Sequence, residues 1–404
     1  MLISPFAPKT LPVLPQVPGL AIAAEAVGLK VARGKAAPRD MLLVRLPEGT
    51  RVAGRFTTSQ TAAAPVRWCR EIVARGTARA LLVNAGNANA FTGARGEADV
   101  IRCAEAVAAQ LDCAADEVLV ASTGVIGEPL PMDTMMAGIT RCAAKLSEAT
   151  PWLHAAEAIG TTDTYPKLCC EDSGGGRVFG IAKGSGMIAP DLATMLAFLW
   201  ATGSEASTAL QERLTMACAT SFEAITVDGD TSTNDTVLAF ALPPLEAVVN
   251  APLPASPAPL AAACASLARQ VVADGEGISK LITVAVKGAI SKGDAKRVAF
   301  SIANSPLVKT AIAGQDANWG RVVMAVGKSG ARVDPTTLTI AFGDERVASG
   351  GARDPDYSET RAAAYLKRPH IDIHVDLGLG QGAFVAYTCD LTHEYIRINA
   401  DYRS

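Results

Sequence analysis

The sequence predicts an α/β protein with more than one domain. Two observations carry this prediction: short apolar runs with the length of buried strands, such as 237–242, and longer runs, such as 97–111, in which apolar residues recur every three or four positions, as on a helix face. The 404 residues are 49% hydrophobic and 19% charged, which is enough apolar material for a large core without disulfides or metals. A chain of this length corresponds to two or three domains.

In the first part of the chain, strands and helices are expected to alternate. In order, the expected elements are strands at 41–46, 52–58 and 80–83, a helix at 97–111, a strand at 117–121 and a helix at 132–146. The first of these helices places Val100, Val107 and Leu111 on one face. The strand expected at 117–121 is followed by Ser122, Thr123 and Gly124. These three residues could form a simple turn or could carry functional groups.

A polar, glycine-rich break at 171–176 precedes the second group of elements. These are strands at 177–181 and 194–202, a helix at 204–218, a strand at 237–242, a helix at 260–273 and a strand at 281–286. The proline-rich stretch 251–259 is the expected linker.

The last third of the chain predicts a second α/β unit. It consists of a hairpin at 335–347 with its turn at Gly343 and Asp344, a helix at 359–367, and strands at 371–377 and 383–387. We therefore expect a core domain over about 1–250 and a smaller α/β domain over about 280–404.

Charge and composition exclude several classes of protein. Lysine and arginine number 37 against 40 acidic residues, a net charge of −3, so no overall field attracts nucleic acid or an anionic membrane. The longest uncharged stretch, 247–268, contains four prolines and cannot span a membrane as a helix. Prolines also interrupt the first 20 residues, which argues against a targeting segment. Nine cysteines without a C-x-x-C pair indicate reduced thiols in a cytoplasmic protein.

Two polar patterns suggest binding sites only weakly. His370, Asp372 and His374 alternate along an expected strand and share one face, where they could ligate a metal. A solvated strand face is the more common meaning of such a pattern, so we expect no metal there. The glycine-rich 378–382 is followed by a strand, whereas a dinucleotide fingerprint leads into a helix, so a β-turn is expected there.

The best candidate for nucleophilic chemistry is Thr194. Only four histidines are present and no G-x-S-x-G motif occurs, so a serine hydrolase with a histidine base is poorly supported. The segment KGSGMIAPDLATML at 183–196 brings Thr194 from a glycine-rich turn to the start of an apolar run. An ordinary strand-opening threonine fits this pattern. So does a self-cleaving one, whose free α-amine would then serve as the base of an N-terminal nucleophile.

At this segment the chain closely resembles the glutamate N-acetyltransferase/ornithine acetyltransferase family, also called the ArgJ family. The resemblance extends over nearly the whole chain. It includes LLVNAGNANAFTG at 81–93, ASTGVIGEPL at 121–130, TTDTYPK at 161–167, ITVDGDTSTND at 225–235, DGEG at 274–277, SPLVKTAIAGQDANWGRVVMAVGKSG at 305–330 and NADYRS at 399–404. Phe91 departs from the pattern, which has a small residue such as cysteine there.

The resemblance assigns roles to individual residues. It implies cleavage between Ala193 and Thr194, with Thr194 as the nucleophile, and an oxyanion hole made by Thr123 and Gly124. A hydroxyl and a backbone N–H aimed at one point are suitable donors for a developing oxyanion. The implied substrate contacts are Thr161, Lys183, Thr194, Glu276, Asn399 and Ser404, with Thr162 as an alternative to its neighbour. Lys183 can neutralise a carboxylate, and Glu276 can pair with an amino group.

The implied reaction moves an acetyl group from N2-acetylornithine to glutamate through an acetyl-threonine, a step in arginine biosynthesis. It implies no metal and no dissociable cofactor, because the threonine hydroxyl carries the group. Acetyl-CoA, which some family members use as a second donor, remains open. The implied fold is an αββα sandwich like that of N-terminal nucleophile hydrolases with a smaller C-terminal α/β domain, and the implied assembly is a dimer of heterodimers of chains 1–193 and 194–404. Two alternatives are an aminopeptidase or amidase on the same fold and a non-enzymatic binding protein that has kept the fold.

Overall fold

The computed structural model describes residues 2–30, 37–172, 177–189, 195–203, 205–244 and 258–400. It divides into two compact units. The larger comprises Pro8–Glu223 and Asp230–Val271, and the smaller comprises Met1–Ala7, Ala224–Gly229 and Val272–Ser404. The division after Val271 falls at the end of a helix and not in the proline-rich 251–259, because that helix packs on the larger unit: the Gln270 side-chain amide exchanges hydrogen bonds with the backbone of Leu168.

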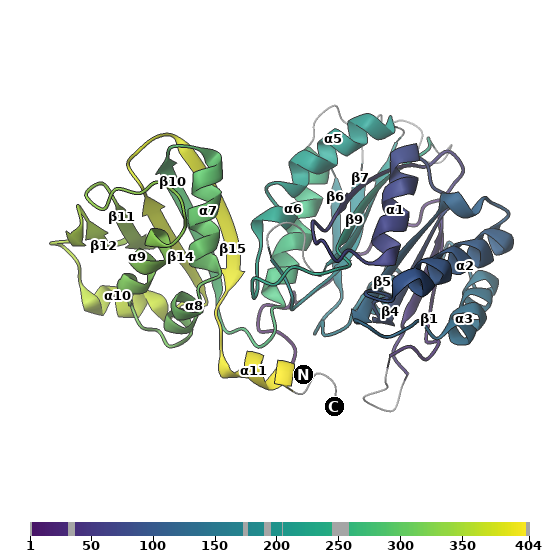
Figure 1. The fold of residues 1–404 in the computed structure, drawn as a ribbon, viewed down its shortest axis with the longest axis horizontal. Helices are drawn as coiled ribbons and strands as arrows, with labels where there is room; N and C mark the ends of the chain where they lie inside the picture. Colours follow the sequence, from purple (N-terminus) through teal and green to yellow (C-terminus); the bar gives the residue numbers. More distant parts are fainter. Residues whose placement is uncertain are drawn as a thin grey trace. The chain divides into compact units, whose positions relative to one another are not determined.

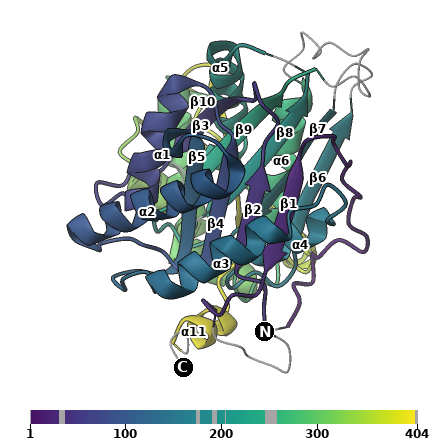
Figure 2. The ribbon, with the colours of Figure 1, turned by 90° about the vertical axis from the view of Figure 1, so that its right-hand side faces the viewer.

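Sheet A of the larger unit has the strand order β1-β2-β4-β5. Its strands are β1 (Ala21–Glu25), β2 (Met41–Arg45), β4 (Ala80–Asn87) and β5 (Val118–Val125). Helices α2 (Gly93–Leu111) and α3 (Met132–Ala144) cover its outer face (Figure 2). Alternate strand residues such as Leu82 and Val120 are buried in one cluster with helix residues such as Val100 and Ile139. This is the pattern of a sheet face covered by amphipathic helices.

Sheet B has the order β3-β9-β8-β7-β6. Its strands are β3 (Arg51–Phe56), β6 (Lys167–Asp172), β7 (Arg177–Lys183), β8 (Leu196–Thr202) and β9 (Thr236–Leu242). Helices α5 (Ser207–Cys218) and α6 (Ala258–Ala273) lie on its outer side (Figure 1). The central strands β8 and β9 are buried along their whole length, as expected for a sheet covered on both faces.

The inner faces of the two sheets share one apolar core. Leu42, Val83 and Leu119 of sheet A belong to the same buried cluster as Phe198 and Phe240 of sheet B. Helices α1 (Ala64–Arg75) and α4 (Trp152–Ile159) complete this unit. The larger unit is thus a sandwich of helices, two sheets and helices, which confirms the α/β class and the αββα arrangement expected from the sequence.

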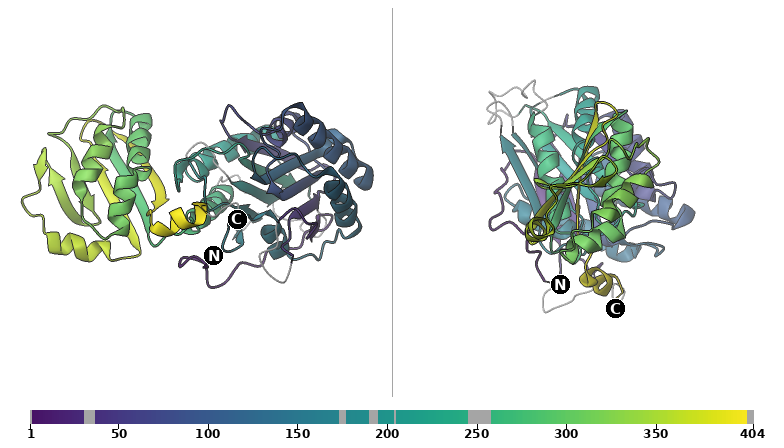
Figure 3. Two further views of the ribbon diagram at one scale, coloured as in Figure 1. Left: turned by 60° about the horizontal axis from the view of Figure 1, so that its bottom comes forward. Right: turned by 90° about the vertical axis from the view of Figure 1, so that its left-hand side faces the viewer.

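The smaller unit has two layers, with helices α7 to α10 packed against sheet C (Figure 3). Sheet C has the order β13-β12-β11-β14-β10-β15. Its strands are β10 (Leu281–Ala289), β11 (Thr339–Phe342), β12 (Glu345–Ser349), β13 (Ala352–Arg353), β14 (His370–Asp376) and β15 (Gly382–Cys389). The helices are α7 (Lys292–Ala303), α8 (Pro306–Ala313), α9 (Trp319–Gly327), α10 (Glu359–Leu366) and the terminal α11 (His393–Ala400).

The expected ends of two strands were wrong. Strands β4 and β5 continue past their expected ends to Asn87 and Val125, because Gly86 and Gly124 pair side by side and a Cβ on Gly124 would overlap the backbone of Gly86. The segment 378–382, where a β-turn was expected, connects β14 to β15 across the end of β10, because both strands pair with β10. The hairpin with its turn at Gly343 is confirmed.

Candidate active site

Thr123 and Lys183 meet in the interior of the larger unit. Thr123 lies within β5, and Lys183 is the last residue of β7, where it pairs with Leu196 of β8. The Lys183 ammonium donates a hydrogen bond of 3.2 Å to the Thr123 hydroxyl oxygen, and both residues are buried. Lys183, the first residue of the motif at 183–196, therefore lies beside Thr123 of the motif at 121–130.

This contact determines what the Thr123 hydroxyl can do. An ammonium has three donors and no acceptor, so the Thr123 oxygen must be the acceptor in the pair. The hydroxyl proton is then free to be donated to another group. A buried hydroxyl that accepts from a cation and donates onward is a good donor for developing negative charge, because the low local dielectric strengthens the interaction.

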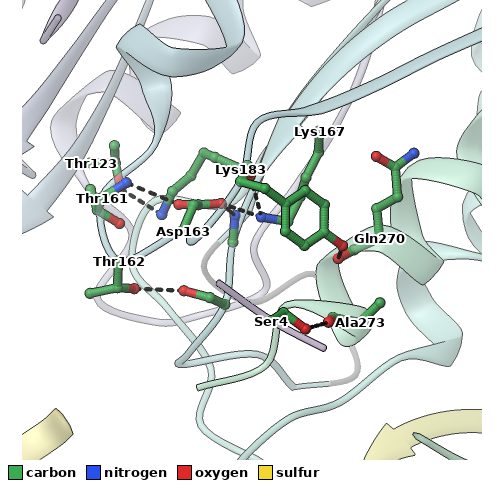
Figure 4. Close-up of polar contacts among 12 residues, drawn as sticks. Ser4, Thr123, Thr161, Thr162, Asp163, Lys167, Lys183, Gln270 and Ala273 are labelled. Atoms are coloured by element: carbon green, nitrogen blue, oxygen red, sulfur yellow. Dashed lines mark hydrogen bonds and ion pairs between the residues drawn. The ribbon is translucent and has the colours of Figure 1, made fainter. Parts of the chain in front are cut away.

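Asp163 links Gly184, the residue after Lys183, to a second buried lysine, Lys167 (Figure 4). Its Oδ1 atom accepts from the Lys167 ammonium at 2.6 Å and from the Gly184 N–H at 2.7 Å, and its Oδ2 atom accepts from the Thr161 N–H at 2.9 Å. Burial alone would raise the pKa of this carboxyl, but the ammonium groups of Lys167 and Lys183 and the Gly184 N–H hold it well below its usual range. Asp163 therefore stays ionised and fixes the start of the loop after β7.

The hydroxyls of Thr161 and Thr162 are not equivalent. The Thr162 hydroxyl hydrogen-bonds to the Ser185 hydroxyl at 2.6 Å, and Thr161 is held through its backbone N–H by Asp163. Both residues are half-buried. The assignment of Thr161 or Thr162 as a substrate contact stays a prediction.

Asn234 and Asp235, which directly precede β9, contact the backbone next to Thr123 and the backbone of Met195. The Asn234 side-chain amide donates to the backbone carbonyls of Ala88 and Ser122 at 2.6 and 2.8 Å. The neighbouring Asp235 accepts from the backbone N–H of Met195 at 2.9 Å. Asn234 and Asp235 therefore tie the residue before Thr123 to the residue after Thr194.

Glu276 and Asn399 come together in the smaller unit. The Asn399 side-chain amide, on α11, donates to Glu276 Oε2 at 2.7 Å and to the backbone carbonyl of Tyr395 at 3.1 Å. Glu276 is 7% exposed. The hydroxyl of Thr392, at the start of the same helix, donates to the carbonyl of Gly277, so α11 is anchored beside Glu276.

The structure thus groups the predicted residues into two sets: Thr123 with Lys183 in the larger unit, and Glu276 with Asn399 in the smaller. Ala193, Thr194 and Ser404 lie outside the described residues. Sequence reasoning missed Asp163, Asn234 and Asp235, although each lies in a motif that it quoted. The signal for the last two was a polar pair directly before the buried strand at 237–242.

The histidine pattern on β14 shows no sign of metal binding. Ile371, Ile373 and Val375 are buried and His370 and His374 are exposed, as a solvated strand face requires. Among the residues that the structure describes, no group of three or more His, Cys, Asp or Glu side chains is placed to hold a metal ion. In the same part of the chain, no helix is long and apolar enough to cross a membrane.

Comparison with known proteins identifies the family. The model of the ArgJ family matches residues 21–404. The chain belongs to the ArgJ family. It is 47% identical over 414 residues to the arginine biosynthesis bifunctional protein ArgJ of Bradyrhizobium diazoefficiens, covering 100% of this chain and 99% of that protein. It is 48% identical over 419 residues to the protein of the same name from Mesorhizobium japonicum, with the same coverage.

A crystal structure of the ArgJ protein of Bacillus halodurans is 41% identical, with a TM-score of 0.46, and covers 52% of this chain and 100% of that chain. The family predicted from the motifs is thereby confirmed by the full-length relatives. The prediction of an ArgJ-family acetyltransferase of arginine biosynthesis is confirmed with it, and a non-enzymatic binding protein is no longer a suitable alternative.

Proposed function

We propose that this ArgJ-family chain transfers the acetyl group of N2-acetylornithine to glutamate through an acetyl-threonine at Thr194. Before transfer, the Thr194 hydroxyl attacks the Ala193 carbonyl, the peptide bond shifts to an ester, and water opens the ester. The products are chains 1–193 and 194–404, which remain together as a heterodimer and pair into a dimer of heterodimers in the cytoplasm.

The observation that best supports this function is the buried hydrogen bond from Lys183 to Thr123. It leaves the Thr123 proton available for an oxyanion, and it lies at the end of β7, whose pairing partner β8 begins two residues after Thr194. The Thr123 hydroxyl and the Gly124 N–H would stabilise the charge that forms when Thr194 attacks the acetyl carbonyl. Such donors act on the transition state more than on the bound substrate.

The two half-reactions use the same groups in opposite order. In the first, Thr194 Oγ bonds to the acetyl carbon, the bond to the ornithine nitrogen breaks, and the Thr194 α-amine passes the hydroxyl proton to that nitrogen. In the second, the glutamate α-amine bonds to the acetyl carbon, the ester bond to Thr194 Oγ breaks, and the Thr194 α-amine passes a proton from the attacking amine to Oγ. Thr161, Lys183, Glu276, Asn399 and Ser404 are the proposed substrate contacts. Lys183 would face a carboxylate, and Glu276 would face an amino group.

The group that takes the acetyl group from Thr194 distinguishes this function from that of an N-terminal nucleophile aminopeptidase or amidase. Both would use Thr194, and only the attacking group, amine or water, would differ. Water is present at tens of molar, so a transferase must hold the amine against the acyl carbon and exclude solvent. The carboxyl group of Glu276 and the amide of Asn399, held together at the end of the chain, supply polar contacts suited to an amino acid. Acetyl-CoA would be a second donor to the same threonine.

Mass spectrometry of the purified chain is the first test. We expect fragments 1–193 and 194–404 from the native sequence and none from Thr194→Ala, with Thr194→Ser still cleaving because it keeps a hydroxyl. N-terminal sequencing should read Thr-Met-Leu-Ala. N-acetylornithine turnover with and without glutamate is the second test. Release of free acetate at the same rate without glutamate would favour the hydrolase.

A further inference from the structure

Lys30 is a half-buried cation in the larger unit that the function proposed above does not use. Its ammonium donates to three backbone carbonyls: that of Arg39 at 2.6 Å, that of Ala158 at 3.2 Å and that of Glu157 at 3.3 Å. The side chains of Arg39 and Glu157 pair with each other at 2.7 Å, whereas Lys30 contacts their backbone. An ammonium has three donors, so Lys30 acts on the protein and not on a ligand.

Two of these carbonyls belong to the last turn of α4. The final carbonyls of a helix have no partner within the helix, and the last turn of α4 contains no basic residue of its own. A positive charge at this end is favourable, because it faces the negative end of the helix dipole. Lys30 supplies that charge from a position 127 and 128 residues earlier in the chain, so it holds the end of α4.

The loop that follows α4 carries residues of the candidate site. The Thr161 N–H donates to the Asp163 carboxylate, which also accepts from the Gly184 N–H. The place at which α4 ends therefore determines where this loop lies. The charge of Lys30 also interacts with the charges of Asp163 and Lys183, which puts the ammonium close to the site.

The backbone of Lys30 is fixed separately, by Asp40. The Asp40 carboxylate is 0% exposed and accepts the N–H groups of the four consecutive residues 27–30, at distances between 2.6 and 3.0 Å. The same turn packs against sheet A: a Cβ on Gly86 would lie 2.5 Å from a carbonyl oxygen of this turn, and Gly86 pairs with Gly124. Lys30 thus connects the turn beside the two glycines to the end of α4.

We propose that Lys30 is a positioning residue for the transfer reaction: its ammonium holds the end of α4, and with it the loop at 160–163, in place beside the strand that carries Gly124. This inference rests on the proposed function, in which Thr161 contacts substrate and Gly124 binds the oxyanion. A displacement of about 1 Å in an active site can cost about 10²-fold in rate. Loss of the ammonium should therefore lower turnover although no group that touches substrate is removed.

The protonation of Lys30 gives this role a pH dependence. Burial lowers the pKa of its ammonium to about 8. The carboxylates of Asp40, Asp163 and Glu157 oppose this change, and the Lys183 ammonium adds to it. A neutral amine has only two N–H donors and cannot serve three carbonyls. The positioning should therefore be lost as pH rises through about 8.

The test is kcat/KM for N-acetylornithine, with glutamate as acceptor, as a function of pH. Lys30→Met keeps the length of the side chain but has no donor, and at pH 7 we expect kcat/KM to fall about tenfold or more. Lys30→Arg stays charged, so it should restore part of the rate. Lys145→Met is the matched control, because the Lys145 ammonium pairs with Glu25 in the same unit and its side chain is 56% exposed.

The pH profile separates charge from shape. In the native chain, kcat/KM should fall as pH rises above about 8, and the profile of Lys30→Arg should lack that fall. A native profile without the fall, or Lys30→Met within about threefold of native at pH 7, would overturn the role of Lys30. If Lys30→Met does not fold, the native profile decides alone. A native chain without activity on N-acetylornithine at any pH would instead remove the proposed function.

Folding stability distinguishes positioning from a merely structural role. Because the folded pKa of Lys30 is lowered, the stability from this group is fully present above the unfolded pKa of about 10.4 and is lost as pH falls through about 8. In the Thr194→Ala background, stability relative to the same chain with Lys30→Arg should therefore rise between about pH 8 and pH 10. Activity should fall over this range. A stability that falls together with the activity would mean that Lys30 only holds the fold together.

Discussion

The Lys183 ammonium donates to the Thr123 hydroxyl oxygen across 3.2 Å, and both side chains are buried. This contact orients the hydroxyl so that its proton points away from the lysine. It also places a positive charge next to the group that we expect to bind an oxyanion. Both effects favour negative charge beside Thr123.

Thr123→Ala should therefore slow the chemistry more than it weakens binding. Loss of one oxyanion donor typically costs about 10²–10³ in kcat. We expect a fall of this size with little change in KM for N-acetylornithine. Thr123→Ser keeps the hydroxyl and should retain most of the activity. A higher KM with kcat unchanged would make Thr123 a ground-state contact.

Gly124 should tolerate substitution less well than Gly127, three residues on. Both have positive φ, 131° and 87°, so an alanine at either position meets strain of about 1–3 kcal/mol. A Cβ at Gly124 would also lie 2.6 Å from the backbone nitrogen of Asn87, whereas one at Gly127 would have nothing within 4 Å. Thermal unfolding and kcat should both suffer more in Gly124→Ala, and equal losses in the two variants would contradict this account.

Much of the fold follows from local patterns in the sequence. The expected strands at 237–242 and 281–286 correspond to β9 and β10, and the helix at 97–111 to α2. Each has a strong apolar period and a clear boundary. Helices α1 and α4 were not predicted, although Val66, Cys69 and Ile72 give α1 a clear helical spacing of apolar residues. The assignment of Ala224–Gly229 to the smaller unit depends on contacts distant in the sequence.

The sequence motifs predicted several residues of the site but not the contacts between them. The resemblance led to Thr123, Lys183, Glu276 and Asn399. It could not reveal that Lys183 is the donor to Thr123, since that depends on β5 of one sheet facing β7 of the other. Nor could it single out Asp163 or Asp235 from the other acidic residues, because their burial and partners arise only in the folded chain.

Glu276→Gln should weaken binding more than it slows chemistry. Glu276 is 7% exposed and accepts a hydrogen bond from the Asn399 amide. This amide is neutral, so the carboxylate keeps its charge and can pair with a substrate amino group. A neutral amide loses that charge-assisted contact, which is worth about 1.5–3 kcal/mol, so KM should rise about tenfold or more. Glu394→Gln is the control, since its ion pair with Arg397 on α11 is exposed. An unchanged KM in Glu276→Gln would exclude this contact.

Asp163→Asn should destabilise the larger unit at neutral pH. The carboxylate lies 2.6 Å from the ammonium of Lys167, which is fully buried, and breaking a buried ion pair costs about 3–5 kcal/mol. Unfolding is best compared in the Thr194→Ala background, so that every variant is a single chain. Asp172→Asn is the control: the ion pair of Asp172 with Arg177 is largely exposed, so its loss should cost less than about 1 kcal/mol.

The pH dependence of this loss has a definite sign. The folded pKa of Asp163 is held below its usual range, so the stability it contributes is fully present above the unfolded pKa of about 3.9. It is lost as pH falls through the lower folded value. The difference between the parent and Asp163→Asn should therefore shrink in acid, and a difference that grows below about pH 4 would contradict the assignment.

Asp235→Asn should show the opposite pH dependence. Because burial raises the folded pKa of Asp235, the folded state holds its proton more tightly than the unfolded state does. Folding stability from this group is then fully present below the unfolded pKa of about 3.9 and is lost as pH rises through the folded pKa. Asparagine does not titrate and avoids this loss. In the Thr194→Ala background, the stability of Asp235→Asn relative to its parent should therefore rise between about pH 4 and pH 8, as followed by denaturant unfolding. A relative stability that falls over this range would mean that Asp235 is an ionised structural anion like Asp163.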